Sequence, residues 1–334
     1  MHMADALVVP QVAGTMYACS AVAMGYSINK MKKINEDNKK IPVMGVMGAF
    51  VFAAQMINFT IPGTGSSGHL CGGILLSAVL GPEAGFLTMI GVLITQCLLF
   101  ADGGVLALGC NIWNMAFYGC FIGIGVIWRL IMKNGISKKK IIVSSIAGCI
   151  ITLQMGAFSV VIETLLSGIT ELPFNVFTSF MLPIHLAIGL VEGLITSAIL
   201  CFIYEVRTDI LWLPDKEMDS TNKKKYFSLK SIIVIFAIAA LIVGGGLSLV
   251  ASANPDGLEW SIENITGSTE LESKRGAYET AEKIQGATAL LPDYSLKDSD
   301  SAADTSIAGI LGGIVVLAVC MGGATAVRVI GRKH

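Results

Sequence analysis

The charged residues of this 334-residue chain are confined to short segments, which leaves long uncharged stretches between them. Such stretches supply the roughly 20 apolar residues that a helix needs to cross about 30 Å of hydrocarbon. Only 14% of the residues are charged and 54% are hydrophobic, whereas ordinary soluble domains carry about 25% charged residues. An all-α integral membrane protein is therefore predicted. The net charge of −1 provides no excess of positive charge for a nucleic-acid partner. Forty-one of the 47 charged residues lie within 30–40, 129–140, 205–230, 252–304 and 328–334.

About nine membrane-spanning helices are predicted from the uncharged stretches. The stretch 69–132 is too long for one helix, and glycine-containing breaks at 81–83 and 102–104 divide it into three. The first of these three is short for a full crossing. The predicted spans lie near 10–29, 41–60, 69–80, 84–101, 104–132, 141–166, 176–204, 231–251 and 306–328.

The Lys and Arg residues gather on one side of the membrane when nine spans alternate in direction. That side receives 19 of the 23 basic residues, and the other four lie in the loop 252–304 beside 11 acidic residues. Because cytoplasmic loops carry the excess of Lys and Arg, the N-terminus is predicted outside and the C-terminus in the cytoplasm. The first residues lack a basic region and a small-residue cleavage site, so no cleaved signal peptide is expected.

A polar segment divides the chain into two unequal parts. Residues 205–230 contain 11 charged residues and are predicted to be a cytoplasmic linker. Residues 1–204 are predicted to form a seven-helix transmembrane bundle, and residues 231–334 a two-helix hairpin around the external loop 252–304. Inside that loop, the composition of residues 268–285 favours a polar helix.

A glycine-rich stretch at 63–68 matches the spacing G-x-G-x-x-G of dinucleotide-binding folds. That motif requires a preceding strand and a following helix in a βαβ unit, whereas here it joins two predicted spans. Its glycines are instead predicted to form a tight external turn. The chain also lacks the phosphate-binding motif G-x-x-x-x-G-K-[ST], so it is not expected to hydrolyse ATP by itself.

Two histidines on the predicted outer side, His2 and His69, are candidate metal ligands. An α-amine readily gives up its proton to a metal, so the amine of Met1, the amide nitrogen of His2 and the His2 imidazole can bind one ion as adjacent chelate rings. A nitrogen from His69 would complete a plane of four. Such a plane favours Ni(II) or Cu(II), and Co(II) is not excluded. The alternative for His69 is that it caps the helix starting there.

The N-terminal residues from Met1 to Leu7, with Pro10 soon after, resemble the CbiM/NikM family. Its members are the substrate-binding membrane subunits of energy-coupling-factor (ECF) transporters for cobalt and nickel. The resemblance continues in matching order along about residues 1–204, and it implies a seven-helix bundle whose N-terminal segment is tucked inward from the outer face. The other stretches that carry it are 61–73, 99–104, 111–115 and 185–193.

The resemblance also implies a ligand set and partners. In the family the ion is held by the terminal amine, the second-residue amide and imidazole, and the histidine of the glycine-rich loop, which correspond to Met1, His2 and His69. The transported Ni(II) or Co(II) is the cargo, and no permanent cofactor is expected. Implied partners are cytoplasmic CbiO/NikO-like ATPases and a membrane-embedded CbiQ/NikQ-like coupling subunit, in the cell membrane of a prokaryote.

The C-terminal part carries a second resemblance. The stretch from Asn254 to Trp260 resembles the PDGLE motif of the small CbiN/NikN-type accessory subunit, which is also two helices around an external loop. The chain is therefore interpreted as a natural fusion of two subunits. The acidic residues of its loop either attract cations to the outer mouth or simply keep the loop soluble.

Several further polar residues lie at the predicted outer end or inside the spans. Ionisable groups at membrane depth are candidates for function, and outer-shell hydrogen bonds orient metal ligands. Two of them, His185 and Glu192, are seven residues apart and so share a helix face; they are predicted either to hydrogen-bond within the bundle or to form a second stop for the ion. The candidates for a supporting shell or a pathway are Asp5, Asp102, Asn111, Asn114, His185 and Glu192.

A subunit of a metal importer is thus the predicted function. The sequence does not distinguish nickel from cobalt. One alternative is a membrane metalloenzyme or redox protein, which would need an open coordination position and an acid/base pair near the ion. Apart from Asp5 and Asp102, the outer loops 1–9, 61–68 and 102–104 offer no ionisable base. The second alternative is a membrane scaffold or receptor that binds no metal.

Overall fold

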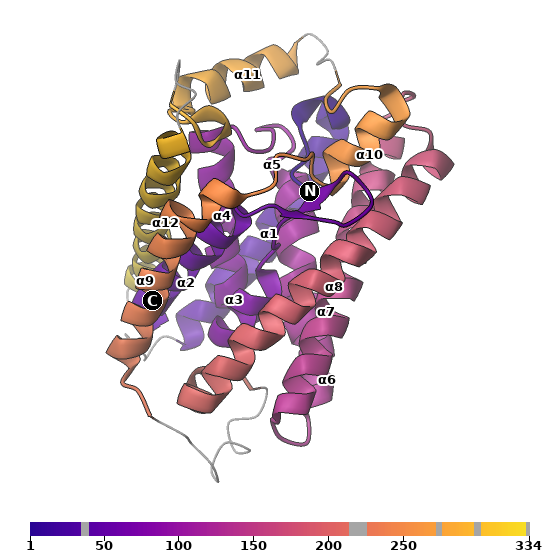
Figure 1. Cartoon of the computed structure of the whole chain (residues 1–334). Coiled ribbons are helices and arrows are strands. Elements are labelled where there is room, and N and C mark those ends of the chain that lie inside the picture. The colour runs from indigo at the N-terminus through magenta and orange to yellow at the C-terminus, as the bar shows by residue number, and fades with distance from the viewer. Residues whose placement is uncertain (35–39, 214–225, 272–275, 297–301, 332–334) are drawn as a thin grey trace.

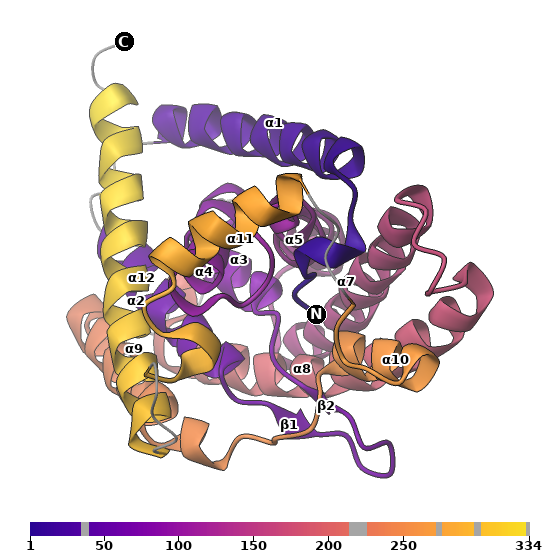
Figure 2. The ribbon, with the colours of Figure 1, turned by 90° about the horizontal axis from the view of Figure 1, so that it is seen from above.

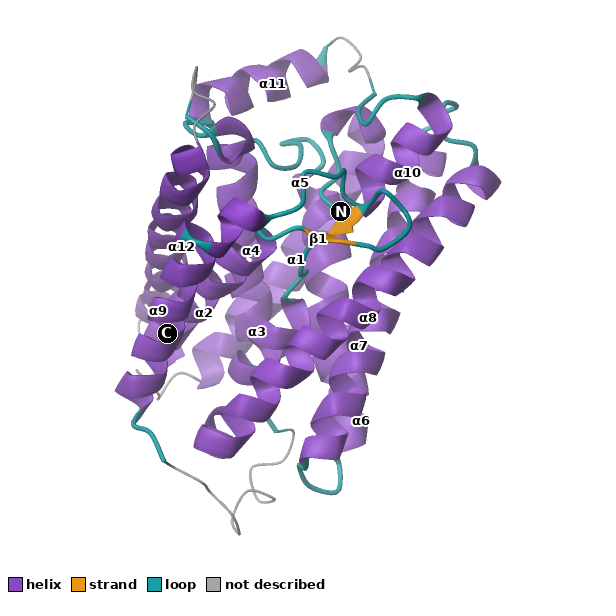
Figure 3. Cartoon of the chain, viewed as in Figure 1, coloured by secondary structure: helices purple, strands orange, loops and turns teal. Residues whose placement is uncertain are grey.

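The computed structural model describes residues 1–34, 40–213, 226–271, 276–296 and 302–331. These residues are almost entirely helical, apart from one short hairpin of two strands (Figures 1 and 3). The elements are η1 (Asp5–Leu7), α1 (Pro10–Ile34), α2 (Lys40–Gln55), β1 (Phe59–Thr60), β2 (Ser67–Gly68), α3 (Gly73–Leu80), α4 (Pro82–Phe100), α5 (Leu108–Asn111), the π-helical η2 (Ile112–Trp128), α6 (Arg129–Met132), α7 (Lys138–Leu166), α8 (Phe174–Arg207), η3 (Thr208–Ile210), α9 (Leu229–Gly245), η5 (Leu247–Val250), α10 (Gly257–Thr266), α11 (Ala277–Thr288), η6 (Pro292–Tyr294) and α12 (Ala302–Gly331).

A helix occupies each of the nine predicted positions, but the helices differ in length. Within the described residues, six helical segments are long and apolar enough to cross a membrane. The prediction of a helical transmembrane bundle therefore agrees with the structure, while the number of nine crossings and their orientation stay predictions. The six segments are Pro82–Phe100, Leu108–Met132, Lys138–Leu166, Phe174–Ile210, Leu229–Val250 and Ala303–Gly331.

The crossing predicted near 69–80 is only partly helical. Helix α3 has eight residues, which at 1.5 Å per residue gives about 12 Å, too short to span the hydrocarbon alone. The helix begins after Gly72, whose φ of 81° is readily adopted by glycine. Residues 69–72 carry no formal charge but are not helical, so the lack of charge did not reveal the true start.

Helices α3 and α4 form a tight antiparallel hairpin. Gly81 joins them with a φ of 87°, and Pro82 occupies the first turn of α4, where its missing N–H costs nothing. The two helices touch at Gly85, where a Cβ would lie 2.8 Å from the Cα of Ser77. The hairpin places the segment 61–72 at the end of the bundle where the N-terminus lies (Figure 1).

Small residues let neighbouring helices of the bundle come close. On α8, Gly189 and Gly193 face α7, and a Cβ on either would lie 3.0 Å or less from the Cα of Ile150 or Ile146. On η2, Gly119 similarly faces the backbone of Gly73. Close backbone approach of this kind is how membrane helices associate without a hydrophobic driving force between them.

The C-terminal helices α9 and α12 pack against the N-terminal bundle. Both lie beside α2 (Figures 1 and 2). Gly48 of α2 makes the contact with α12, since a Cβ there would lie 3.1 Å from Cys320 Sγ. Helices α10 and α11 lie across the end of the bundle that holds the N-terminus (Figure 2). The predicted hairpin is thus joined to the bundle along its length.

Two predicted boundaries differ from the observed ones. Helix α8 continues to Arg207, and η3 follows it, although residues 205–210 were assigned to the linker 205–230. There Arg207 pairs with Asp209 at 2.6 Å, so these charges support the helix end; residues 214–225 of the linker lie outside the described residues. The polar helix expected over 268–285 is α11, which begins at Ala277 and ends at Thr288.

Candidate metal centre

The first four residues, which form neither a helix nor a β-strand, run into the bundle. Met1 is 6% exposed and Met3 is fully buried. The amide oxygen of Asn111 accepts a hydrogen bond from Met3 N at 2.7 Å, and its Nδ2 donates to Met3 O at 3.1 Å. Gly104 N also donates to Met3 O at 2.9 Å. These bonds fix the backbone beside His2, where an amide nitrogen was predicted to bind metal.

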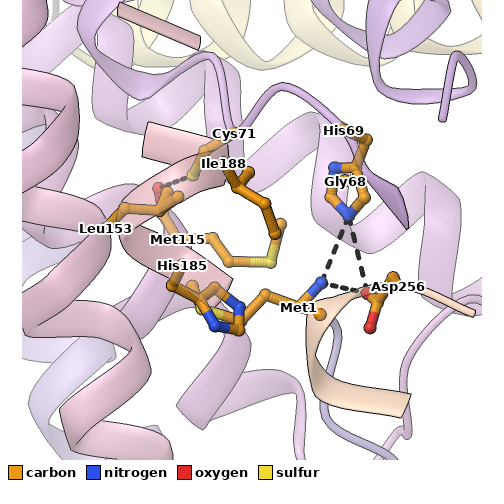
Figure 4. Close-up of a pocket in the computed structure, with 10 residues that line it drawn as sticks. Met1, Gly68, His69, Cys71, Met115, Leu153, His185, Ile188 and Asp256 are labelled. Carbon is orange, nitrogen blue, oxygen red and sulfur yellow. Dashed lines mark hydrogen bonds and ion pairs between the residues drawn. The ribbon is translucent and has the colours of Figure 1, made fainter. Parts of the chain in front are cut away.

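The Met1 amine lies next to one ring nitrogen of His69. The amine nitrogen is 3.2 Å from His69 Nε2, although the two residues are 68 positions apart (Figure 4). On the other side of the ring, His69 Nδ1 is 2.9 Å from the carbonyl oxygen of Leu70. A carbonyl can only accept, so Nδ1 carries the proton and the lone pair of Nε2 faces the amine.

The His2 ring stacks on the His69 ring, with centroids 5.3 Å apart and planes at 21°. Its Nδ1 lies 3.1 Å from Asp102 Oδ1, and its Nε2 lies 3.2 Å from Gln96 Oε1. Tyr294 donates its hydroxyl proton to Asp102 Oδ2 at 2.5 Å. Tyr294, a residue of the C-terminal part, therefore positions the Asp102 carboxylate that contacts His2.

Both imidazoles are kept in the neutral form. Burial lowers the pKa of His2, and the nearby Asp102 carboxylate only partly offsets this effect. Burial and the positive charge of the Met1 amine lower the pKa of His69 to about 3. A neutral imidazole keeps a lone pair available, which is the form that binds metals.

Side chains of the bundle hold the loop that carries His69 by hydrogen bonds to its backbone. Glu192 Oε1 accepts a hydrogen bond from Gly72 N at 2.9 Å, and Gln55 Nε2 donates to Cys71 O at 2.8 Å. Upstream, β1 pairs with β2 in antiparallel register, with Phe59 opposite Gly68. The turn between them contains Gly63 and Gly65 at φ near 78°, as a tight glycine turn requires.

Three other predicted residues occupy supporting positions. Asp5 Oδ1 accepts from Ala107 N at 3.0 Å, which ties the N-terminal segment to the loop before α5. Asn114 Nδ2 donates to Glu163 Oε2 at 2.8 Å inside the bundle. His185 Nδ1 donates to Met181 O at 2.8 Å.

The His185 ring lies beside Met1 (Figure 4). Its Nε2 has no hydrogen-bond partner among the described residues. With Met1 and His69, His185 lines a cavity of about 10 Å³ (Figure 4). Such a cavity has room for about one water molecule. The structure thus brings His185 to the edge of the candidate centre, while Glu192 acts on the loop backbone.

The PDGLE segment of the C-terminal part docks directly on the glycine-rich loop. Ser67 N donates to Pro255 O at 2.8 Å, and Trp260 Nε1 donates to Thr64 O at 3.0 Å. The Asp256 carboxylate forms an ion pair with the Met1 amine and lies 3.8 Å from His69 Nε2. Burial alone would raise the pKa of Asp256, but the charge of the Met1 amine holds it below its usual range.

A larger cavity of about 490 Å³ lies beside His2 and His69, between the bundle and the C-terminal loop helices. Its lining includes the carboxylates of both parts of the chain and, among the described residues, no Lys or Arg. The acidic residues that line it are Asp5, Asp102, Asp256, Glu259, Glu270, Glu282 and Asp293.

Three residues at the centre were not predicted: Gln96, Asp256 and Tyr294. Glu163, which accepts a hydrogen bond from Asn114 inside the bundle, was not predicted either. The PDGLE motif drew attention to Asp256, but no local pattern places it beside residue 1. The suggestion that His69 caps a helix is wrong, because α3 begins at Gly73 after the cap residue Gly72. Within the described residues, no group of three His, Cys, Asp or Glu side chains is arranged for a metal ion, so a centre here depends on backbone nitrogens.

Gly257 is required for this docking, and its replacement gives a direct test. A Cβ there would lie 2.9 Å from Ile188 Cδ1 and 3.0 Å from His185 Cε1. We expect Gly257→Ala to weaken the docking of α10 by about 1–3 kcal/mol, as overpacking does, and to speed proteolysis of the loop 252–304. Gly286→Ala, in α11 with no atom within 4 Å of its Cβ, should leave the cleavage rate unchanged. Equal rates for Gly257→Ala and the native chain would contradict the tight contact.

Comparison with known proteins gives two family matches. The CbiM family, described as the cobalt uptake substrate-specific transmembrane region, matches residues 2–210. The PDGLE domain matches residues 230–329. Both resemblances seen in the sequence are therefore confirmed, in the predicted order.

Relatives with both parts in one chain are also found. A protein of Archaeoglobus fulgidus named as a fused nickel transport protein, NikMN, is 34% identical over 322 residues, which cover 96% of each chain. The LarMN protein of Lactiplantibacillus plantarum, named as a fused nickel transport protein, is 28% identical over 79% of each chain. A crystal structure titled a truncated transition metal transporter has 32% identity and a TM-score of 0.54, and the match covers 61% of this chain and 99% of that one.

Proposed function

Because the chain belongs to the CbiM family and carries a PDGLE domain, we propose that it captures Ni(II) or Co(II) outside the cell as the substrate-specific subunit of an ECF-type importer. It is a multi-pass membrane protein with helices able to span the bilayer. The observation that carries the proposal is the approach of the Met1 amine to within 3.2 Å of His69 Nε2, beside the stacked His2 ring.

The proposed site is a plane of four nitrogens. The Met1 amine and the His2 amide close a five-membered ring with the ion, and the amide and His2 Nδ1 close a six-membered ring, so only His69 must come from elsewhere. Nitrogen ligands lie about 2.0–2.1 Å from such an ion, which puts neighbouring ligands about 2.8–3.0 Å apart in a square plane. The separation of 3.2 Å between the amine and His69 Nε2 is close to that value.

The supporting residues have proposed roles in this scheme. Gln96 Oε1 is placed to accept a hydrogen bond from His2 Nε2, which is the tautomer whose Nδ1 lone pair can bind the ion once the ion displaces the contact of Nδ1 with Asp102 Oδ1. Asn111 holds the backbone next to the His2 amide. Glu192 holds the loop after His69. His185 would meet the ion only after it leaves the nitrogen plane, on the inner side.

The acid-lined cavity supports capture from outside. Seven carboxylates, with no Lys or Arg among the described residues of the lining, create a negative potential, which raises the local concentration of divalent cations. We propose that this cavity faces the exterior, in keeping with an external N-terminus and nine crossings. The domain division at 205–230 would then put the linker in the cytoplasm, within reach of CbiO/NikO-like ATPases and a CbiQ/NikQ-like coupling subunit.

The arrangement favours transport over catalysis. An enzyme would need a free acid or base next to the ion, and the two candidates predicted from the sequence are engaged, since Asp5 accepts a hydrogen bond from Ala107 N and Asp102 is shared by His2 and Tyr294. Calorimetric titration of the purified full chain with NiCl2, CoCl2 and MgCl2 tests the function. We expect one Ni(II) or Co(II) per chain and no saturable Mg(II) binding; absence of any transition-metal binding would favour the scaffold alternative.

Metal binding should release protons. The Met1 ammonium paired with Asp256 must lose one proton, and the His2 amide must lose another, whereas His69, with a pKa near 3, contributes none at neutral pH. Affinity should therefore rise with pH, by up to about 100-fold per unit when two protons are released. Titration calorimetry in buffers of different ionisation enthalpy counts the released protons. Release of none would show that neither backbone nitrogen is a ligand.

A further inference from the structure

Asp256 divides its two carboxylate oxygens between different tasks. Oδ1 caps α10 by accepting hydrogen bonds from Leu258 N at 2.7 Å and Glu259 N at 3.0 Å. Oδ2 takes no part in the cap and instead faces the Met1 amine and His69. The side chain is only 13% exposed. A helix cap alone requires one oxygen, so the second is available for another ligand.

Three potential donors surround one point in this structure. The Met1 nitrogen, His69 Nε2 and Asp256 Oδ2 form a triangle whose longest side is the 3.8 Å between His69 and Asp256. That side is shorter than two metal–ligand bonds of about 2.0–2.2 Å. One ion can therefore touch all three atoms without a rearrangement of the backbone.

We propose that Asp256 Oδ2 is a direct ligand of the transported Ni(II) or Co(II), supplied by the C-terminal part and placed out of the plane of the four nitrogens. The proposal rests on the function proposed above and adds a fifth donor to it. When the amine gives up its proton to bind the ion, Asp256 loses its cationic partner. A buried carboxylate left without a partner is strongly destabilising, and the incoming ion takes the place of the ammonium charge.

The charges balance only when this carboxylate is included. A divalent ion bound to a deprotonated His2 amide and to three neutral nitrogens carries a net charge of +1. The carboxylate of Asp256, which is only 13% exposed, brings that sum to zero. The pairing is therefore favoured both before the ion binds, with the ammonium, and after it binds, with the metal.

The structure holds Asp256 in place before the ion arrives. Its backbone N donates to Glu259 Oε2 at 2.9 Å, which completes a capping box. The preceding carbonyl, of Pro255, accepts from Ser67 N at 2.8 Å. The following residue, Gly257, fits against His185. Because its neighbours already position Asp256, little conformational entropy is lost when it binds the ion.

Asp256→Asn in the full chain tests the proposal, because asparagine also caps helices well but removes the charge and the carboxylate donor. Titration with NiCl2 and CoCl2 should show about 10- to 100-fold weaker affinity, at least the loss seen when a supporting residue is removed, with unchanged stoichiometry. The visible absorption of the bound ion should also shift, since it reports the number and type of donors. Glu263→Gln removes the same charge from an exposed position of the same helix and should change neither measurement.

Three results would overturn the proposal: unchanged affinity and absorption in Asp256→Asn, tighter binding in Asp256→Asn, or an equal loss in Glu263→Gln. Tighter binding would mean that the carboxylate competes with the ion for the amine. An unchanged thermal unfolding temperature in Asp256→Asn confirms that the variant folds. If His69→Ala still binds metal normally in the same assay, the four-nitrogen site itself is wrong, and that failure is separate from a failure of Asp256.

Discussion

Replacing His69 with alanine is expected to abolish high-affinity binding of nickel and cobalt. The imidazole supplies the only proposed nitrogen that does not come from the first two residues, and its Nε2 lies 3.2 Å from the Met1 amine. The ring stacked on it, His2, already belongs to the chelate and so cannot replace it in the plane. Removal of a supporting partner alone costs about 10- to 100-fold in metal affinity, so loss of a ligand should exceed 100-fold. Calorimetry with NiCl2 measures it, and His2→Ala should behave alike.

The variant should remain folded, which separates a lost ligand from a lost structure. The loop is still held by Glu192 on Gly72 N and by Pro255 on Ser67 N. Thr60→Ala, in the same hairpin but exposed and distant from the amine, provides the matched control and should bind normally. Affinity within twofold of the native value in both histidine variants would rule out the assigned site.

Insertion of one leucine after Met1, a side chain too bulky to permit removal of the initiator methionine, is expected to eliminate uptake. The insertion moves the amine by up to about 3.8 Å relative to the His2 ring and makes the histidine the third residue. The new amide then supplies a fourth nitrogen, so the plane can close without His69. We expect metal uptake to fall to background in cells that also produce the ATPase and coupling subunits, and any metal still bound should be insensitive to His69→Ala.

The matched control is Met3→Leu, which alters the same buried segment without changing the register of the amine. Leucine and methionine are similar in volume, and such exchanges usually cost less than about 1.5 kcal/mol. Uptake should remain near the native level in this variant. Native uptake in the insertion variant, still dependent on His69, would show that the terminal amine is not a ligand.

The helical architecture could be predicted from the sequence because charge and hydropathy report bilayer crossings directly. A helix is found at each of the nine predicted positions. The half-length α3 could not be foreseen, because residues 69–72 carry no formal charge either, and the helix begins only after Gly72, which is in the left-handed conformation. The true end of α8 was hidden for the opposite reason: the pair Arg207–Asp209 has the polarity of a linker but stabilises a helix end.

The candidate site could be anticipated only in part. Covalent geometry makes Met1 and His2 adjacent donors, and the family resemblance supplied His69 as their partner. The roles of Asp256 and Tyr294 were invisible, because they depend on how a loop more than 250 residues away folds back on the N-terminus. Neither the spacing of charged residues nor the PDGLE motif specifies such a long-range contact.

The docking of residues 254–260 on the loop 64–69 takes place within one polypeptide. When two modules share a chain, the effective concentration of one at the other is of millimolar order for a short flexible connection. Contacts as few as the hydrogen bonds of Ser67 and Trp260 then suffice to keep the segment in place. Where the same modules are separate subunits, they would have to meet by diffusion. The fraction of loops 64–69 with a docked PDGLE segment would then vary with the abundance of the smaller subunit. In the fused chain, that fraction is independent of expression level.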